Sequence, residues 1–500
     1  PISSVDCSCR SVFLFELCRK VLTAGMARWF WKAALFFKLL TLVNGDETCA
    51  PDGSSLLQSV KAQRSIDEFK RFRGTPNETM HKLAHILKVP DGLFPYDVMP
   101  ECMKDGEVVE PALVTQSMTK KEYDDIVKKV KEVYDGLDKT CGGEHCERAD
   151  FAGCIVRLAG HDFMDYNPKD QKGGSDGCVD LMDPDNGGLA SCLYTGADLG
   201  VSIADVYEHF CSTVSLADFI VIAANAMIER TRQNVLDDEP KRGKIDLKSI
   251  FRYGRTTAKK CPEAKGILPN PEESCNDVER VFVKNMGLDW KHAAALMGVH
   301  TLGRCKPENS GYNGWWSNAG NSNKFNINYY IKMTAEGWVP KKRSEKKHQW
   351  NLGGETRKRQ DKQGKQMMLN TDMCLVWSND ADGKVDINAA TASKYKCHCA
   401  WLGPLESPKS WQKYNNGRFC GSTYIPDDFP SWTRQRRVCC RDIYDPYGED
   451  TDCGRPQAPR GRAWGHVKWF MENEDNWLKT FKEAWKKSTE NGQSNLHGLK

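Results

Sequence analysis

The sequence predicts a mainly α-helical fold, because apolar residues recur at helical spacing in several long segments while regular strand alternation is scarce. The chain has 500 residues, 40% of them hydrophobic and 28% charged, which is an ordinary composition for a folded globular protein. No internal repeat is evident. The fold class is therefore predicted from periodicity rather than from composition.

Two early helices carry the first informative pattern. One begins at Thr119 and has a stripe made of Tyr123, Ile126, Val127, Val130, Val133 and Tyr134. The next has the i, i+3, i+4, i+7 stripe Phe151, Cys154, Ile155 and Leu158. Arg157 and His161 are four residues apart, so they project from one face of this second helix.

Three later helices are also predicted. Residues 215–229 read as a buried helix capped by Ser215, and Asp289 caps another that leads to His300. The last strong helix has Trp477, Phe481, Ala484 and Trp485 on one face. The stretch 341–365, rich in Lys, Arg and Gln, is expected to be an exposed loop.

The N-terminal region resembles a targeting leader. Residues 1–45 are assigned to a leader with Met26 as its start, and its apolar run from Trp29 to Val43 is interrupted by Lys32 and Lys38. A run of about fifteen residues is short for a membrane span, which needs roughly twenty. We therefore expect a cleaved secretory signal and no integral membrane protein, with an organellar (plastid) leader or an anchor as the alternatives. Residues 46–118 form an N-terminal extension without assignable periodicity.

Cysteine usage agrees with export. Three of the 21 cysteines precede the expected cleavage point, which leaves an even 18 and favours disulfides in an oxidising compartment. Residues 381–460 contain six of them and read as a disulfide-stapled insertion. Cys397-His398-Cys399 invites a zinc interpretation, but the paired C-x-x-C spacing of structural zinc sites is missing.

The charge of the chain excludes one class of partner. The net charge is +4, and residues 1–45 hold six of the 71 basic and two of the 67 acidic residues, so the remainder has 65 of each. A neutral remainder provides no general attraction to nucleic acid, and none is expected as a partner.

Two histidines, His161 and His300, are the candidate catalytic residues. A neutral imidazole is a suitable axial ligand for haem iron, and a carboxylate such as Asp372 that accepts its other N–H increases its basicity. Peroxide cleavage further needs a base and a cation, which His161 and Arg157 could supply. Asn186 could hold the His161 ring by accepting its Nδ1–H.

Each of these residues also has an ordinary structural explanation. A single histidine on an apolar helix face is more often a hydrogen-bonded core residue, and an Arg–His pair four apart is often a surface coincidence. Asp372 could be only a helix N-cap, and Asn186 in the D-N-G-G segment could be only a turn residue. Spacing alone does not decide between these interpretations.

Several ordered motifs resemble the plant-type haem peroxidase superfamily from about residue 119 to the C-terminus, minus the insertion. Residues 157–161 (RLAGH) resemble its distal motif, and residues 295–305 (ALMGVHTLGRC) resemble its proximal histidine segment. Residues 186–189 (NGGL) fall where the family has its distal asparagine. Residues 368–375 (MLNTDMCL) resemble the block that holds the proximal aspartate, with Asn370 in place of proline. Tyr253-Gly254-Arg255 and Leu268-Pro269 also stand in family order.

The resemblance implies a fold of two helical halves with haem b between them, and a haem-dependent peroxidase that reduces hydrogen peroxide. It implies His300 as the iron ligand and Arg157, His161, Asn186 and Asp372 as catalytic positions. Residues 309–316 (NSGYNGWW) resemble the cytochrome c peroxidase and ascorbate peroxidase branch. Trp316 then stands at the tryptophan that packs on the proximal histidine, either as a radical site or as a packing residue. The electron donor, a small molecule or a protein, is not identified.

Three departures from the family pattern bear on function. Gly160 replaces the distal aromatic, which predicts a more open pocket unless a side chain such as Phe163 fills it. Asn309 stands where ascorbate peroxidase has an arginine for its substrate, which argues against ascorbate. Asp162, Gly174 and Asp176 match distal calcium ligands of secreted branches, and Thr301 is a further candidate. However, Cys178 replaces the usual serine, and Asn326 stands where the proximal site needs aspartate.

Two other functions remain open from the sequence. A non-catalytic, peroxidase-like extracellular scaffold could use the insertion to bind partners, although all five catalytic positions are kept. An ascorbate-type organellar peroxidase would require the N-terminal segment to be an organelle leader.

Overall fold

The computed structural model describes residues 95, 99–100, 102–193, 202–261, 267–335, 338–344, 346–352, 357–377 and 461–500, which belong to one compact unit. The leader, the extension up to residue 94 and the insertion 381–460 lie outside these residues. The predictions made for those three segments, including the domain boundaries, stay predictions.

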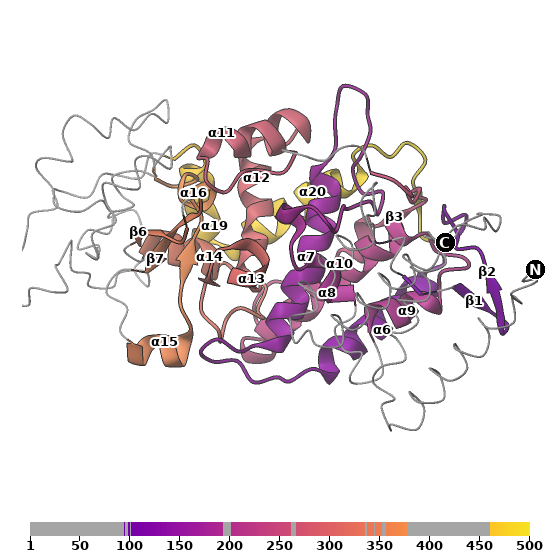
Figure 1. The fold of residues 1–500 in the computed structure, drawn as a ribbon, viewed down its shortest axis with the longest axis horizontal. Coiled ribbons are helices and arrows are strands. Elements are labelled where there is room, and N and C mark those ends of the chain that lie inside the picture. Colours follow the sequence, from indigo (N-terminus) through magenta and orange to yellow (C-terminus); the bar gives the residue numbers. More distant parts are fainter. Residues whose placement is uncertain are drawn as a thin grey trace, which may run out of the picture. The chain divides into compact units, whose positions relative to one another are not determined.

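Helices dominate the described chain and form two groups, named here by the histidine each carries (Figure 1). The distal half, with His161, contains α6 (Lys120–Gly136), α7 (Glu147–Met164), η2 (Pro184–Asn186), α8 (Leu189–Leu193), α9 (Ile203–Glu208), α10 (Leu216–Asp238) and η4 (Lys248–Ile250). The proximal half, with His300, contains α11 (Cys275–Val278), the π-helix η5 (Glu279–Asn285), α12 (Trp290–Met297), η6 (Gly298–Thr301), α13 (Pro307–Ser310), α14 (Asn328–Ala335), α15 (Arg357–Gln363) and α16 (Asn370–Met373). The C-terminal helices are α19 (Trp464–Glu472) and α20 (Glu474–Glu490). The predicted mainly α fold is confirmed.

The predicted helix starts are confirmed by their capping contacts. The Thr119 side chain accepts from the Glu122 amide while the Glu122 carboxylate accepts from the Thr119 amide, which forms a capping box. Ser215 caps α10 through the Asp218 amide, and Asp289 caps α12 through the His292 amide. Helix α10 runs to Asp238, beyond the predicted end at residue 229, because its buried face continues through Thr231, Arg232, Val235 and Leu236.

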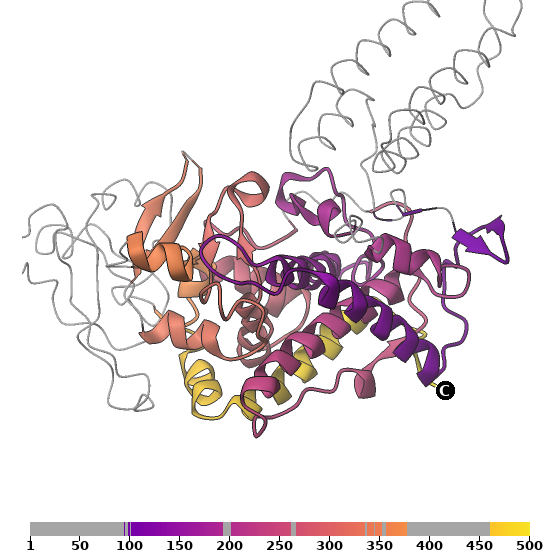
Figure 2. The same cartoon turned by 90° about the horizontal axis from the view of Figure 1, so that it is seen from below.

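Helix packing joins the two halves. Helix α10 packs on α6 and α7, whereas α20 contacts both α12 and α7 and so belongs to both halves. Seen from below, the yellow C-terminal helix runs beside the magenta helices of the distal half (Figure 2). A buried ion pair, Arg232 to Glu474 at 2.7 Å, fixes the start of α20 to α10. Loss of one partner would leave the other charge buried and unpaired.

The strands of the described chain are short and form small sheets. They are β1 (Cys102–Lys104) with β2 (Glu107–Val109), β3 (Arg252–Tyr253) with β9 (His497–Gly498), β4 (Arg304–Cys305) with β5 (Gly314–Trp315), and the sheet of β6 (Trp338–Lys342), β7 (His348–Leu352) and β8 (Met367–Met368). The described pairs between these strands are antiparallel. The expectation of an exposed loop at 341–365 is therefore wrong: this stretch contributes to a hairpin and to α15. The polar composition of this stretch predicted exposure to solvent. In the structure, however, His348 and Gln349 are buried and form hydrogen bonds with residues distant in the sequence.

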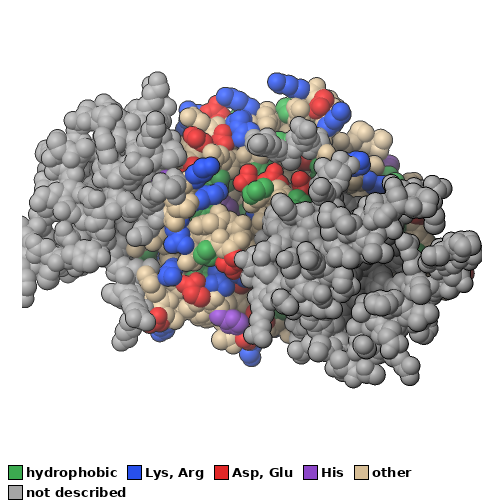
Figure 3. Space-filling view, in the orientation of Figure 1, with side chains coloured by type: hydrophobic (Ala, Val, Ile, Leu, Met, Phe, Trp, Pro, Cys, Tyr) green, Lys and Arg blue, Asp and Glu red, His purple; other side chains and the backbone are tan. Residues whose placement is uncertain are grey.

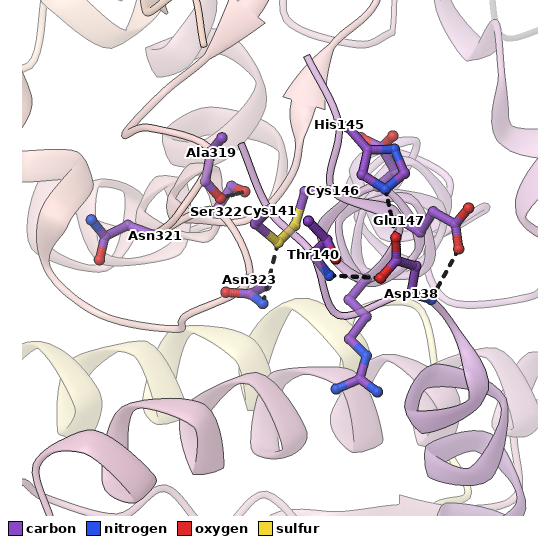
Figure 4. Close-up of a disulfide and its surroundings, with 12 residues drawn as sticks. Asp138, Thr140, Cys141, His145, Cys146, Glu147, Ala319, Asn321, Ser322 and Asn323 are labelled. Carbon is purple, nitrogen blue, oxygen red and sulfur yellow. Dashed lines mark hydrogen bonds and ion pairs between the residues drawn. A yellow bond between two sulfur atoms is a disulfide. The ribbon is translucent and has the colours of Figure 1, made fainter. Parts of the chain in front are cut away.

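Five disulfides occur among the described residues: Cys102–Cys211, Cys141–Cys146, Cys154–Cys192, Cys178–Cys261 and Cys275–Cys374. Cys305 is a free thiol. The Cys141–Cys146 bridge closes the loop before α7, where the Asp138 carboxylate accepts from the Thr140 amide and lies 3.0 Å from His145 (Figure 4). Cys146 packs in one apolar cluster with Trp315, so this bridge lies where the distal helix meets the proximal half.

The surface carries both signs of charge. Figure 3 shows lysine and arginine side chains interspersed with acidic ones over the visible described face, in keeping with the near-neutral sequence beyond residue 45. Among the described residues, no helix has the length and apolar character needed to cross a membrane.

Candidate active site

His300 lies just beyond α12, in the tight turn η6. Gly298 opens this turn where the chain passes two large side chains: a Cβ there would lie 2.5 Å from the Tyr330 hydroxyl and 2.6 Å from Trp477 Nε1. Only glycine tolerates so close an approach. The turn leaves 29% of the His300 side chain exposed, so this imidazole faces an open region rather than the core.

Asp372 is fully buried in α16 and accepts four hydrogen bonds. Its Oδ1 accepts from His300 Nδ1 and from the Tyr329 hydroxyl, each at 2.8 Å. Its Oδ2 accepts from Trp316 Nε1 at 2.8 Å and from the Leu369 amide at 2.7 Å. Burial alone would raise the pKa of Asp372, but His300 and these hydrogen bonds hold it below its ordinary value. An ionised carboxylate only accepts, so His300 Nδ1 carries the proton.

Aromatic rings enclose the proximal histidine. Trp316 stacks on His300 with the ring centroids 4.3 Å apart and the planes at 17°, and Tyr329 meets it edge-on at 5.8 Å and 83°. The structure thus brings together His300, Asp372 and Trp316 as the sequence predicted. The N-cap interpretation of Asp372 is wrong, because Leu369 is the N-cap of α16 and Asp372 is the third residue of the helix, whose carboxylate accepts from the Leu369 amide.

The distal residues meet at the end of α7. His161 Nδ1 lies 2.7 Å from Asn186 Oδ1, and Asn186 Nδ2 donates to the Asp180 carbonyl at 2.8 Å. The second bond orients the amide so that its oxygen faces the ring, which places the proton on His161 Nδ1. Arg157 Nε donates to His161 Nε2 at 3.2 Å, so Nε2 holds a lone pair. Asn186 therefore orients the His161 ring and is not only a turn residue.

The electrostatics of the distal pair suit a neutral base. Burial, the Arg157 charge and a smaller effect of His300 lower the pKa of His161 to about 3. Arg157 is held in place by the carbonyls of Gly187 at 2.8 Å and Asp185 at 2.7 Å. An unprotonated imidazole beside a fixed guanidinium can take a proton while the cation stabilises developing negative charge.

Gly160 leaves room beside the distal histidine. The nearest atom to a Cβ built there is the Met164 methyl carbon, 4.0 Å away. Phe163 does not fill this space; it is buried edge-on against Trp485, with the ring centroids 5.6 Å apart. A small hollow beside His161 is lined in part by Asp165, Asp180, Asp183 and Asp185.

The predicted calcium residues fall into two separate places. Asp162 and Asp176 lie with Asp165, and Asp162 accepts from the amides of Gly177 and Cys178, both at 3.1 Å. The Gly174 amide donates to Asp165 at 2.6 Å. Thr301 is elsewhere: its hydroxyl donates to Asn326 and to the Lys324 carbonyl. Cys178, which replaces the expected serine ligand, is bonded to Cys261.

Asp162, Asp165 and Asp176, called the acidic set here, all have raised pKa values. Burial and the Asp176 charge raise the pKa of Asp165 to about 8, and burial raises that of Asp176 to about 6. Burial and both neighbours raise the pKa of Asp162 well above its ordinary value. A divalent cation would relieve this repulsion. However, no group of three or more metal-ligating side chains with suitable geometry occurs in the described chain.

The two histidines fit a haem group. His300 Nδ1 is occupied by Asp372, and its Nε2 has no hydrogen-bond partner among the described residues, which leaves this nitrogen for iron. His161 lies within electrostatic range of His300 and offers a base, with Arg157 as the cation.

Two residues in these clusters escaped prediction from the sequence. Tyr329 is 43 positions from Asp372, and a tyrosine in an apolar helix is predicted to be a core residue rather than a partner of a distant carboxylate. Asp165 follows Asp162 by one helical turn, and this i, i+3 spacing was the one available signal.

Comparison with known proteins agrees with this geometry. The model of the family described as Peroxidase matches residues 124–391. The mitochondrial cytochrome c peroxidase of Candida albicans is 29% identical over 260 residues, which cover 51% of this chain and 60% of that protein. L-ascorbate peroxidase 2, cytosolic, of Arabidopsis thaliana is 29% identical over 204 residues, covering 40% of this chain and 72% of that protein. Cytochrome c peroxidases and ascorbate peroxidases are thus among the proteins that this chain resembles. The chain belongs to the peroxidase family, as the sequence predicted.

Proposed function

We propose that this protein reduces hydrogen peroxide at a haem b group and oxidises a one-electron donor. The observation that carries the proposal is the pairing of two prepared imidazoles, His300 with Nε2 open and Nδ1 bonded to Asp372, and His161 with its lone pair on Nε2. When bound, haem supplies the redox chemistry of peroxide reduction. The protein supplies ligation, proton transfer and electrostatics.

Each residue has a defined task in this proposal. His300 would hold the haem iron through Nε2, and Asp372 orients it and increases its basicity. His161 Nε2 takes a proton from the inner peroxide oxygen and returns it to the outer one, which leaves as water. Arg157 stabilises the charge on the leaving oxygen, and Asn186 keeps the His161 ring in the required tautomer.

The donor is proposed to be neutral rather than ascorbate. Asn309 replaces the arginine expected of ascorbate peroxidases, and its main chain and side chain pack so tightly on Gly187 and Gly188 that neither glycine could carry a Cβ. Asp180, Asp183 and Asp185, which line the hollow beside His161, also disfavour an anion there. An ascorbate-type organellar enzyme is therefore the weaker alternative.

An oxidising compartment is proposed for the mature protein. Ten of the described cysteines are paired in five disulfides, which are rare in reducing compartments. The secretory pathway is favoured and an organelle is the alternative. Cytochrome c would then be an unsuitable electron donor, although one relative is named a cytochrome c peroxidase.

Stopped-flow spectroscopy of the haem-loaded protein tests the proposal. Mixing with hydrogen peroxide should change the Soret band of the wild type, and His161→Leu should slow this change by about 10² to 10⁴-fold. His145→Leu is the matched control, because His145 is exposed just before the same helix. A wild type that takes up haem but shows no reaction with peroxide would favour the scaffold alternative.

Gly160→Trp tests the openness of the distal side. A Cβ at this position meets no close neighbour, so a side chain can start there without a clash, and an indole would narrow the pocket. We expect a fall of about tenfold in kcat/KM for bulky donors, with a smaller change for hydrogen peroxide. Unchanged rates and donor range would show that Gly160 does not control access.

A further inference from the structure

One short loop holds both residues that the proposed peroxide cleavage needs. Residues 185–188 (DNGG), called the distal loop here, accept hydrogen bonds from the Arg157 guanidinium through the Asp185 and Gly187 carbonyls, at 2.7 and 2.8 Å. Asn186 in the same loop faces His161 Nδ1 at 2.7 Å. The position of the distal loop therefore sets the positions of the arginine and the histidine.

The helices around the distal loop are too short to fix it by themselves. Helix η2, which ends in the loop, has three residues, and α8, which follows it, has five. Helices of this length gain little from their own hydrogen bonds. Contacts with more distant parts of the chain must therefore hold the loop in place.

The Cys154–Cys192 disulfide provides such a contact. Cys154 is on α7, three residues before Arg157. Cys192 is in α8, four residues after Gly188, and Cys154 Sγ lies 3.6 Å from the Gly188 carbonyl oxygen. One covalent bond thus ties the helix that carries Arg157 and His161 to the loop that orients them.

The same turn of α7 is also fixed to the proximal half. A Cβ on Gly153 would lie 2.8 Å from Gly303 Cα, and Gly303 follows His300 by three residues. Only glycines allow two backbones to approach this closely. The disulfide therefore starts from a point on α7 that has a fixed place beside the His300 segment.

We propose that Cys154 and Cys192 are positioning residues for peroxide cleavage, and that they act as a disulfide that holds the distal loop against α7. The inference rests on the proposed peroxidase activity. Without the bond, the loop carbonyls and Asn186 would shift relative to Arg157 and His161. Because a misplacement of about 1 Å can cost about 10²-fold in rate, a small shift of the loop is enough to slow the reaction.

The first experiment separates positioning from stability. Cys154→Ala/Cys192→Ala is compared with Cys102→Ala/Cys211→Ala, which removes the bridge between β1 and the turn after α9. The sequence separation of the cysteines is 109 in the control bridge and 38 in Cys154–Cys192, so the control variant should lose more stability in denaturant unfolding.

The rates should follow the opposite order. Loss of Cys154–Cys192 should slow the reaction of haem-loaded protein with hydrogen peroxide by about tenfold or more. The control variant should change this rate by less than about twofold, and kcat/KM for guaiacol at saturating peroxide should change as little in both variants. If the rate loss followed the stability loss, the bridge would have only a structural role.

Single variants show whether the bond itself matters. Cys154→Ala and Cys192→Ala each remove the same disulfide, so each should slow the peroxide reaction as much as the double variant does. Two losses that add in the double variant would point to independent packing of the two side chains and would contradict the proposal.

Hydrogen exchange of the full-length protein without peroxide provides a readout that does not depend on turnover. The amides of Asn186 and Gly187 donate to the Asp183 and Pro184 carbonyls, so their exchange reports on the distal loop. Peptides that contain these amides should exchange faster in Cys154→Ala/Cys192→Ala than in the wild type, whereas peptides from residues 215–229 should be unchanged. An unchanged loop would refute the positioning role.

A measurement on the wild type covers the case in which the variants do not fold. The protein is partly reduced with tris(2-carboxyethyl)phosphine, the released thiols are alkylated, and the remaining disulfides are quantified by peptide mass spectrometry. The remaining rate with hydrogen peroxide should follow the fraction of intact Cys154–Cys192. A rate that followed Cys102–Cys211 instead would show that the proposal is wrong.

The outcomes also separate this proposal from the activity on which it rests. A haem-loaded wild type that does not react with hydrogen peroxide would refute the proposed function itself. A wild type that reacts, together with a Cys154→Ala/Cys192→Ala variant that reacts equally fast, would leave the proposed function intact and overturn the positioning role of the disulfide.

Discussion

At the scale of single residues, the proximal site is organised by the division of one carboxylate among four donors. His300 and Tyr329 share Oδ1 of Asp372, while Trp316 and the Leu369 amide share Oδ2. Two donors on one oxygen compete for its electron density. Tyr329 should therefore limit how strongly Asp372 increases the basicity of His300, and so weaken the electron donation of His300 to a bound iron.

Tyr329→Phe tests this competition. Without the hydroxyl, His300 should bond more strongly to Asp372, so the ferrous iron–histidine stretching frequency should rise and the haem reduction potential should fall by an amount on the order of tens of millivolts. Resonance Raman spectroscopy and potentiometric titration measure these shifts. Tyr330→Phe is matched, since Tyr330 is equally buried but donates to the Ala294 carbonyl. If Tyr329→Phe and Tyr330→Phe gave the same stretching frequency and the same reduction potential, the Tyr329 hydroxyl would have no influence on His300 through Asp372.

The acidic set near α7 makes a prediction about pH. The pKa of Asp165 is raised to about 8 in the folded protein, against about 4 when unfolded. The folded state thus binds its proton more tightly, and this stabilising effect is complete below pH 4 and lost as the pH rises through 8. The thermal midpoint of the wild type should fall more steeply between pH 5 and pH 8 than that of Asp165→Asn.

Calcium is tested in the same series. If Asp162 and Asp176 bind the ion, millimolar calcium should raise the thermal midpoint at pH 8 and a chelator should reverse the rise, because a ligand that binds the folded state stabilises it. Asp176→Asn should remove the effect. An unchanged midpoint in the wild type would exclude a calcium site in this loop.

The sequence predicted the central residues but not their surroundings. His161, His300 and Asp372 stand in motifs with characteristic order, so resemblance located them. Tyr329 and Asp165 act through contacts made by folding, and so does Thr301, which donates to Asn326. A linear pattern does not specify which side chains share a buried carboxylate.

At the scale of elements, α16 is a helix of four residues that depends on its neighbours for its position. Asn370, which replaces the proline of the family, donates to the Glu272 carbonyl and accepts from Trp350 Nε1. The Cys275–Cys374 disulfide ties the end of α16 to α11. Short helices gain little from their own hydrogen bonds, so these tertiary links hold Asp372 in register with His300.

Replacing both Cys275 and Cys374 with serine should destabilise the protein by about 2–4 kcal/mol. Because α16 is loosened, the double variant should also bind haem less tightly. The control is the Cys102–Cys211 bridge, which lies between β1 and the loop after α9, remote in sequence from Asp372. Denaturant unfolding gives the stability, and haem titration gives the affinity. Equal loss of haem affinity in both double variants would argue against a specific role for α16.

Helix ends and the hairpin illustrate what element prediction could achieve. The starts at Thr119, Ser215 and Asp289 were predictable because capping chemistry is local. Strand β7 was not, since its buried His348 and Gln349 depend on Glu272 and Asn313, which are distant in sequence.

At the scale of the whole molecule, the two halves are joined by α20 and by the Arg232–Glu474 pair. Haem ligation by His300 opposite His161 would add a further link between them. Haem at 100 times its dissociation constant should then stabilise the protein by about 2.7 kcal/mol. His300→Ala should lose this stabilisation, whereas His292→Ala, at a half-buried position near the start of α12, should keep it. Calorimetry of apo and haem-loaded protein measures the difference.

The four donors on Asp372 also affect how relatives of this protein should be judged. A chain that lost this aspartate would bury the Trp316, Tyr329 and Leu369 donors without an acceptor, at a cost of about 1–3 kcal/mol for each. A descendant that had abandoned catalysis would still be under selection to keep Asp372 for folding. Arg157 and His161 are under no such constraint from a shared carboxylate, so their presence is the better sign that a family member is an active enzyme.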